Sequence, residues 1–286
     1  MKTITSLKLF FKPEKDVIIP PYSSKLSRSI ILKILEKEGL TSIVDRIRKP
    51  MTHKPYVFTV VFHGNKPLYR TEEEKEKKPL MLKGRRVYWF KFTIIEGVEA
   101  HKVVGAVASR SNVEVYSTKF SIVGIEAETV DFRKVGFEEN PEQLHVKFIT
   151  PVLLQIPRPR RLRGKVGVRH ILFPIPSLII YSLAKHWNSN APEEMKIPNI
   201  VKLAKISNYI MVEVDHQIKP ETVIYDEKRR PRGFTGWTLY KLNRKVSEKH
   251  YKTILKLLKY ANYVGVGRSR TIGFGTTQTT SKTPRS

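Results

Sequence analysis

One order of secondary-structure elements occurs twice along this chain. In the first half, the hydrophobic pattern predicts strand, helix, two strands, helix and strand over residues 3–12, 22–38, 55–63, 85–95, 98–109 and 116–132. In the second half, it predicts the same order over residues 144–156, 175–188, 208–218, 232–242, 247–261 and 270–279. This βαββαβ order is that of a ferredoxin-like domain. The sequence therefore predicts an α+β fold with two tandem ferredoxin-like domains, over residues 1–140 and 141–286.

Two of the predicted helices each carry one apolar stripe. In helix 22–38 the stripe consists of Leu26, Ile30, Ile31, Ile34 and Leu35. In helix 247–261 it consists of Tyr251, Ile254, Leu255, Leu258 and Ala261. Spacings of three and four residues place each set on one face of its helix. Each helix is therefore expected to pack against a sheet.

The charge of the chain indicates a polyanionic partner. The sequence holds 53 Lys and Arg against 26 Asp and Glu, which gives a formal net charge of +27. Residues 1–140 contribute +9 of this charge and residues 141–286 contribute +18. Such an excess is typical of proteins that bind nucleic acid. The second half is expected to carry most of the binding surface.

The composition also excludes several kinds of chemistry. There are no cysteines, which excludes disulfides, cysteine zinc sites, iron–sulfur clusters and thiol nucleophiles. The eight histidines show no metal-ligand spacing with carboxylates, so we expect no metal and no cofactor. No apolar run is long enough to span a bilayer, and the first residues do not read as a signal peptide. We expect a cytoplasmic protein that makes no membrane contact.

A glycine-rich motif near the end of the chain is the most specific local signal. Residues 265–275 read GVGRSRTIGFG, with two Gly-hydrophobic-Gly triplets on either side of two arginines. Glycine allows backbone amides to approach a ligand closely, and arginine offers paired donors to phosphate oxygens. The motif therefore predicts contacts with a phosphate backbone. The candidate contacts are Gly267, Arg268, Ser269, Arg270, Gly273 and Gly275.

Three further basic segments are candidates for nucleic-acid contact. Residues 157–170 form a proline- and glycine-broken loop that contains Arg158, Arg160, Arg161 and Arg163. Residues 226–233 form a turn between two strands that contains Arg229, Arg230 and Arg232. Lys249, Lys252, Lys256 and Lys259 recur at helical spacing on the last helix, where no acidic residue follows Glu248 to pair with them.

The first helix and the segment after it supply candidates for catalysis. Lys25 and Arg28 lie three residues apart in the first turns of helix 22–38. A phosphate bound near that end would be stabilised by both cations and by the helix dipole. His53 and Lys54 lie at the entrance to strand 55–63. By its position, His53 is the best candidate for a general base among the histidines.

Together these features resemble the CRISPR-associated repeat-processing endoribonucleases of the repeat-associated mysterious protein superfamily. The glycine-rich motif at residues 265–275 is the specific match. The tandem layout, the strand entry at residues 54–59 and the basic last helix are also similar. The resemblance implies cleavage of the repeat in precursor CRISPR RNA without metal. The 2′-hydroxyl would attack the adjacent phosphate and leave a 2′,3′-cyclic phosphate and a 5′-hydroxyl.

The resemblance also implies where the catalytic groups lie. The family often places a histidine between the first helix and the second strand, with a tyrosine and a lysine. Here that interval holds His53 beside Lys54, which strand alternation would point to opposite faces. We therefore favour a histidine-poor site with Lys25, Arg28, Lys54 and Arg232 as its cations, assisted by Arg268 and Ser269. Such a site would act mainly by orienting the 2′-hydroxyl and stabilising charge.

Two other functions remain open on the sequence. One is a non-catalytic RNA-binding subunit of a CRISPR interference complex, and the other is a general nucleic-acid-binding protein such as a ribosomal one. The glycine-rich motif argues against the general binder. Further expectations from the resemblance are a homodimer and the hand-over of the product to an interference complex. The sequence names neither the repeat nor the position of the cut.

Overall fold

The chain divides into two compact units in a computed structural model that describes residues 2–74, 78–95, 97–159, 161 and 164–282. Unit 1 comprises Met1–Lys134 together with Val223–Arg230 and Thr271–Gly273. Unit 2 comprises Val135–Thr222, Pro231–Arg270 and Phe274–Ser286. Two short segments from the second half of the sequence thus belong to unit 1, which a division of the chain at residue 140 does not anticipate.

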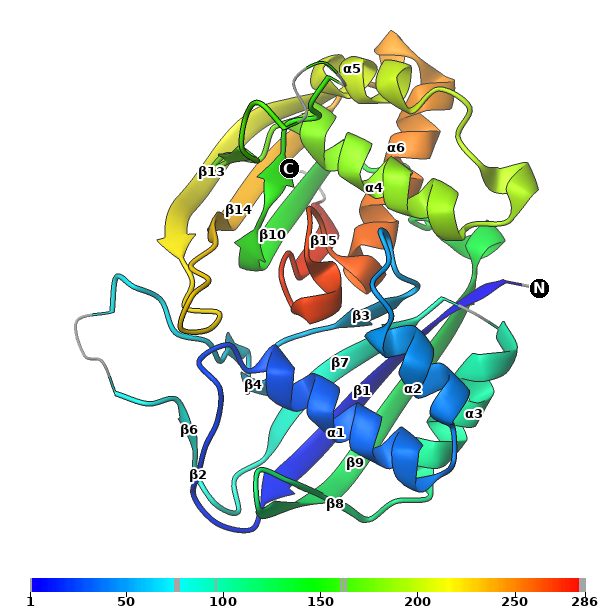
Figure 1. The fold of residues 1–286 in the computed structure, drawn as a ribbon. Coiled ribbons are helices and arrows are strands. Elements are labelled where there is room, and N and C mark those ends of the chain that lie inside the picture. Colours follow the sequence, from blue (N-terminus) through cyan, green and yellow to red (C-terminus); the bar gives the residue numbers. More distant parts are fainter. Residues whose placement is uncertain (1, 75–77, 96, 160, 162–163, 283–286) are drawn as a thin grey trace. The chain divides into compact units, whose positions relative to one another are not determined.

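Unit 1 is built on an antiparallel sheet with the order β5-β4-β7-β1-β9-β8, and β3 also pairs with β7. Its six main elements are β1 (Thr3–Pro13), α1 (Ser24–Lys37), β3 (Tyr56–Phe58) with β4 (Phe62–His63), β7 (Tyr88–Ile94), α3 (Gly97–Ala108) and β9 (Thr118–Asp131). The smaller elements are β2 (Val17–Ile18), α2 (Thr41–Arg48), β5 (Lys66–Pro67), β6 (Met81–Leu82) and β8 (Asn112–Val115). Helices α1 and α3 pack on one face of the sheet (Figure 1).

The alternation of β1 explains why that face is apolar. Leu7, Leu9 and Phe11 are all buried, and Leu9 pairs with Phe90 of β7 and with Ile125 of β9. The predicted stripe of α1 faces the same core, because all five of its residues are fully buried. Burying side chains of this size supplies most of the stability of such a layer.

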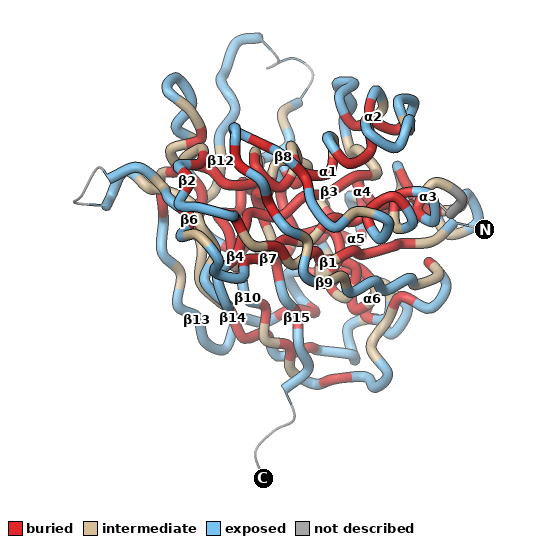
Figure 2. The backbone as a smooth tube through the Cα atoms, turned by 90° about the horizontal axis from the view of Figure 1, so that it is seen from below, coloured by how far each residue is buried: buried red, intermediate tan, exposed pale blue. Residues whose placement is uncertain are grey.

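Unit 2 repeats the arrangement with a four-stranded antiparallel sheet in the order β13-β14-β10-β15. Its main elements are β10 (Gln143–Val152), α4 (Pro176–Asn190), β13 (Met211–Thr222), β14 (Arg232–Leu242), α6 (Glu248–Val264) and β15 (Thr277–Lys282). An additional helix, α5 (Ile200–Ile210), lies between α4 and β13, and β11 (Leu154–Gln155) pairs with β12 (His170–Ile171). Strand β13 is exposed along most of its length, because it forms the edge of the sheet (Figure 2).

The two sheets have the same topology. In each, the four main strands lie in the order fourth, first, third and second. This confirms the predicted α+β fold with tandem ferredoxin-like units. The sequence prediction missed α2, α5 and β8. It was also wrong to begin the last strand at residue 270, because residues 270–272 form a 3-10 turn and β15 begins at Thr277.

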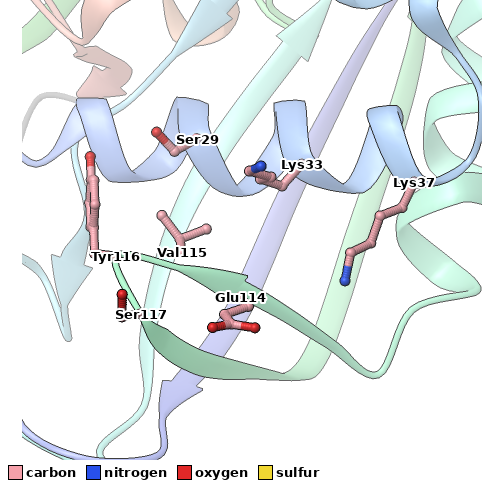
Figure 3. A pocket seen from close by; sticks show the side chains of 7 residues that line it. All are labelled: Ser29, Lys33, Lys37, Glu114, Val115, Tyr116 and Ser117. Carbon is pink, nitrogen blue, oxygen red and sulfur yellow. The ribbon is translucent and has the colours of Figure 1, made fainter.

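A two-residue turn joins β8 to β9 and lines a small pocket on unit 1. Both turn residues are in the left-handed region, with φ of 52° at Tyr116 and 54° at Ser117. That geometry matches the twist of an antiparallel hairpin and usually requires asparagine or glycine. The turn faces Ser29, Lys33 and Lys37 of α1 across a pocket of about 440 Å³ (Figure 3). Among the described residues, no helix is long and apolar enough to cross a membrane.

Candidate active site and glycine-rich loop

The beginning of α1 holds the end of the glycine-rich segment within unit 1. The Tyr22 hydroxyl donates to the carbonyl of Gly273 at 3.0 Å, and the Ser24 hydroxyl donates to the carbonyl of Ile272 at 2.6 Å. Gly273 has a φ of 90°, and a Cβ atom there would lie 2.8 Å from Cβ of Ser24. Only glycine therefore fits at this contact with the helix.

Two cations lie against one tyrosine ring beside this contact. Lys25 Nζ lies 4.7 Å from the centre of the Tyr225 ring, and the Arg229 guanidinium carbon lies 4.5 Å from it. Tyr225 in turn packs on Tyr22, with 5.6 Å between ring centres. Aromatic faces attract cations, so the ring positions both side chains at the N-terminal end of α1.

Asp226 compensates part of this positive charge. Its carboxylate accepts a hydrogen bond of 2.7 Å from Arg229 Nε and lies 4.0 Å from Lys25 Nζ. The side-chain hydrogen bond from Arg229 lowers the pKa of Asp226 to about 2. The carboxylate therefore stays ionised at neutral pH and occupies the position that an anionic ligand of Lys25 would take.

Arg28 and Lys54 converge on one backbone carbonyl. Lys54 Nζ donates to the carbonyl oxygen of Ile47 at 2.8 Å, and Arg28 Nη2 donates to the same oxygen at 3.4 Å. Ile47 lies in the last turn of α2, where cations stabilise the helix. Burial and the charge of Arg28 lower the pKa of Lys54. Lys25, Arg28 and Lys54 thus form one group of cations in unit 1, called here the α1 cation group.

The structure places the other two catalytic candidates differently. His53 and Lys54 lie in the turn before β3, and His53 has a φ of 58°. The expectation that strand alternation separates these two side chains was therefore wrong, because neither residue lies in a strand. Arg232 is the exposed first residue of β14 in unit 2.

The two ends of the glycine-rich segment, residues 265–270 and 274–275, lie in unit 2 and are held together there by backbone hydrogen bonds. The Val266 amide donates to the Gly275 carbonyl at 2.8 Å, and the Gly275 amide donates to the Pro151 carbonyl at 3.0 Å. The Gly267 amide donates to the Ser182 hydroxyl at 3.0 Å. A Cβ atom on Gly275 would lie 1.8 Å from the Val266 oxygen.

These contacts give the glycines an internal role. Gly267, Gly273 and Gly275 are all buried against the protein's own backbone or side chains. The sequence analysis interpreted these glycines as positions where the backbone approaches a ligand. The structure gives a second reason for glycine there, because a Cβ atom would collide with the protein's own atoms. Direct contact of these three glycines with RNA stays a prediction.

The three residues between the glycine triplets that were predicted to contact RNA differ in exposure. Arg268 and Ser269 are exposed, and Arg268 Nη1 donates to Gln155 Oε1 at 2.5 Å. Arg270 is only 5% exposed, which contradicts a place for its side chain on the RNA-facing surface. It donates to the Ser182 carbonyl at 3.0 Å and to the Ser182 hydroxyl. Burial lowers the pKa of Arg270 to about 10, so it remains a cation at neutral pH.

The remaining predicted RNA contacts lie on three segments. Arg158 is half-buried and donates to the Val166 carbonyl at 2.8 Å, while Arg161 is exposed. Arg160 and Arg163 lie outside the described residues. Arg230 pairs with Glu72 at 3.1 Å in unit 1. Lys256 is half-buried on α6 in unit 2.

Sequence reasoning missed two parts of the α1 site. Asp226 was assigned only to the basic turn 226–233. Tyr225 was not considered, and neither was Tyr69, whose ring centre lies 5.8 Å from that of Tyr22. No local sequence pattern predicts such contacts, because these residues are far apart in the sequence. Within the described residues, no group of three or more His, Asp or Glu side chains is arranged to hold a metal ion.

Comparison with known proteins identifies the family. Residues 5–130 match the Cas6 N-terminal domain, and residues 146–277 match the CRISPR-associated endoribonuclease Cas6. The chain is 26% identical over 279 residues to CRISPR-associated endoribonuclease Cas6 2 of Saccharolobus solfataricus, covering 92% of this chain and 91% of the relative.

Solved structures show the same fold. A Cas6 product complex is similar with a TM-score of 0.71 and 18% identity, covering 97% of this chain and 99% of that chain. Cas6 of Thermus thermophilus is similar with a TM-score of 0.68 and 14% identity, covering 98% of this chain and 99% of that chain. Since the two family matches span most of both halves of the sequence, this chain belongs to the Cas6 family of CRISPR-associated endoribonucleases.

Proposed function

We propose that this protein cuts the repeat of precursor CRISPR RNA by internal transesterification. The 2′-hydroxyl loses its proton, and its oxygen forms a bond to the adjacent phosphorus. The bond from phosphorus to the 5′-oxygen breaks, and that oxygen takes up a proton. The products are a 2′,3′-cyclic phosphate and a 5′-hydroxyl. The names of the relatives support RNA-cleaving activity, and the α1 cation group is the observation that supports this chemistry.

Each cation of the group has a role in this proposal. Charge builds up on the phosphate oxygens in the transition state, and fixed cations stabilise it strongly where water is limited. Lys25 and Arg28 serve as these fixed charges, and a phosphate replaces the Asp226 carboxylate beside Lys25. Lys54 adds a third charge, and His53 next to it is the candidate proton acceptor. Arg232 is proposed as a further phosphate contact.

The decisive experiment uses the repeat RNA encoded beside this gene. We expect one cut in the presence of a metal chelator, with a 2′,3′-cyclic phosphate on the upstream fragment. A matched RNA with a single 2′-deoxy substitution at the cut nucleotide should bind equally and remain intact. Binding without any cleavage would favour the non-catalytic subunit. Cleavage of the deoxy RNA would contradict the mechanism.

The lowered pKa of Lys54 predicts how cleavage depends on pH. Burial and the charge of Arg28 favour the neutral form of Lys54, so its pKa lies below the ordinary lysine pKa of 10.5. As the pH rises, Lys54 therefore loses its charge earlier than an ordinary lysine does. The enzymatic rate, corrected for spontaneous hydrolysis, should therefore fall as the pH rises through the pKa of Lys54. Arg keeps its charge throughout this range, so Lys54→Arg should remove the fall. An identical alkaline limb in both proteins would contradict a charge-stabilising role for Lys54.

Three further proposals accompany this function. We expect a homodimer, which light scattering of the purified protein would test. We expect the product to be handed over to an interference complex, which co-purification of the cut RNA with that complex would test. We also propose that the reaction takes place in the cytoplasm, which fractionation of cells that produce the protein would test.

A further inference from the structure

A lysine-rimmed cavity lies on unit 2, toward the N-terminal half of α6. Its volume is about 710 Å³, and its walls come from the end of α4, the segment that leads into α5, and the first turns of α5 and α6. Buried apolar side chains, Trp187, Leu203 and Leu257, form part of its lining. We call it the α5–α6 pocket. It combines an apolar interior with a polar entrance, as small-ligand sites do.

The rim of this pocket carries more positive charges than nearby carboxylates neutralise. Five lysines and one carboxylate line it: Lys196, Lys202, Lys249, Lys252 and Lys256, and Glu194. Lys196 pairs with Glu193, and Lys252 pairs with Glu248 at 3.0 Å. In the part of the chain that the structure describes, Lys202, Lys249 and Lys256 have no carboxylate within ion-pair distance. Lys256 Nζ lies 6.0 Å from the centre of the Trp187 ring.

The Glu248–Lys252 pair stabilises the helix, but the positions of the lysines are otherwise unfavourable for it. Lys249 and Lys252 lie in the first two turns of α6, where the helix dipole disfavours a cation. Lys252 and Lys256 are four residues apart on one face, where like charges repel. An anion at the rim would reverse both effects. The arrangement of the lysines therefore favours binding of a negatively charged ligand.

We propose that the α5–α6 pocket is a second RNA subsite, which binds a single-stranded segment of the same repeat RNA that the proposed function requires. One nucleotide places its base against the apolar lining, and the flanking phosphates meet Lys202, Lys249 and Lys256. The net charge of +18 on residues 141–286 makes a nucleic-acid strand the best complement to this rim.

The length of α6 sets the distance between this subsite and the glycine-rich loop. At 1.5 Å per residue, Lys256 and Lys249 lie about 12 and 22 Å along the helix from its end at Val264. At 3.4 Å per nucleotide of stacked strand, this corresponds to roughly four to seven nucleotides. The subsite would therefore hold RNA several nucleotides away from any segment bound at the loop.

The test is the salt dependence of RNA binding by a variant with K202Q, K249Q and K256Q. Each substitution removes a charge and keeps a side chain of similar length. Loss of three phosphate contacts should reduce the slope of log affinity against log salt by about 2, and affinity at 0.1 M salt roughly a hundredfold. The matched control carries K205Q, K241Q and K245Q, which remove three exposed charges of unit 2 outside the pocket.

A second comparison uses RNA shortened stepwise from each end. We expect the pocket variant and the unsubstituted protein to bind equally once the strand is too short to reach the pocket. If the slope of log affinity against log salt is the same for the pocket and control variants, the proposed subsite is wrong. It is also wrong if the pocket variant keeps its RNA affinity but no longer binds polyglutamate, because the pocket then binds an acidic polypeptide and not RNA. Both outcomes leave the proposed cleavage reaction intact, because that reaction is measured separately by the cyclic-phosphate product.

A cavity-filling variant separates base binding from charge. Thr253 lines the pocket on α6 and is half-buried, so Thr253→Phe fills part of the space while all five lysines remain. We expect RNA affinity to fall several-fold with an unchanged salt slope. An unchanged affinity would overturn the placement of a base in the pocket.

Discussion

The variant K25A/R28A/K54A is expected to cut repeat RNA at least a hundredfold more slowly than the unsubstituted protein. Removing a single donor that stabilises transition-state charge typically costs 10²–10³ in rate, or about 2.7–4 kcal/mol. The three effects will not simply add, because Arg28 and Lys54 share the Ile47 carbonyl and neighbouring residues couple. The measurement is single-turnover cleavage with protein in excess, so that weaker binding does not mask the chemical step.

A structural role must be separated from a catalytic one in this experiment. Arg28 and Lys54 also stabilise the end of α2 through the Ile47 carbonyl, so their loss could loosen unit 1. The variant R28K/K54R keeps both charges, and we expect it to retain more cleavage than the alanine variant at equal thermal stability. The variant K33A/K37A removes two cations from the same helix, outside the α1 cation group. If K25A/R28A/K54A cleaves the RNA at the single-turnover rate of the unsubstituted protein, the proposed site is wrong.

Local patterns were enough to predict the layers of this fold. The apolar stripes of α1 and α6 and the alternation along β1 fix which faces are buried, because these periods are properties of single elements. The same reasoning fails for α5, because this helix ends at Ile210 and β13 begins at the next residue. The continuous apolar pattern therefore predicts a strand that begins at residue 208, inside the helix. It also fails for α2, whose eight residues are too few for a clear helical period.

The candidate site was only partly predictable for a different reason. Spacing places Lys25 and Arg28 on one face of a helix, but Lys54 joins them only through the carbonyl of Ile47. Tyr225 and Asp226 reach Lys25 across about two hundred residues of sequence. Contacts of this range depend on how the whole unit folds, and a single sequence does not encode them in any local pattern.

The glycine-rich loop leads to the second large expected effect. A Cβ atom on Gly275 would lie 1.8 Å from the Val266 oxygen, and the backbone φ of 71° is itself unfavourable for alanine. The Val266 carbonyl cannot move away freely, because the Val266 amide is bonded to the Gly275 carbonyl in the same closed loop. Gly275→Ala must therefore open this hydrogen-bonded pair or distort both strands of the loop.

We expect Gly275→Ala to destabilise the protein by about 2–4 kcal/mol and to lower its melting temperature by roughly 5–10 °C. RNA cleavage should be lost at temperatures where the variant is still folded, since the loop positions Arg268 and Ser269. The control is Gly105→Ala on α3, where a Cβ atom meets nothing within 4 Å and helix propensity predicts a gain of about 0.5–1 kcal/mol. If Gly275→Ala melts like the unsubstituted protein, Gly275 is not required for internal packing, and its place in the motif must instead reflect direct contact with the RNA backbone.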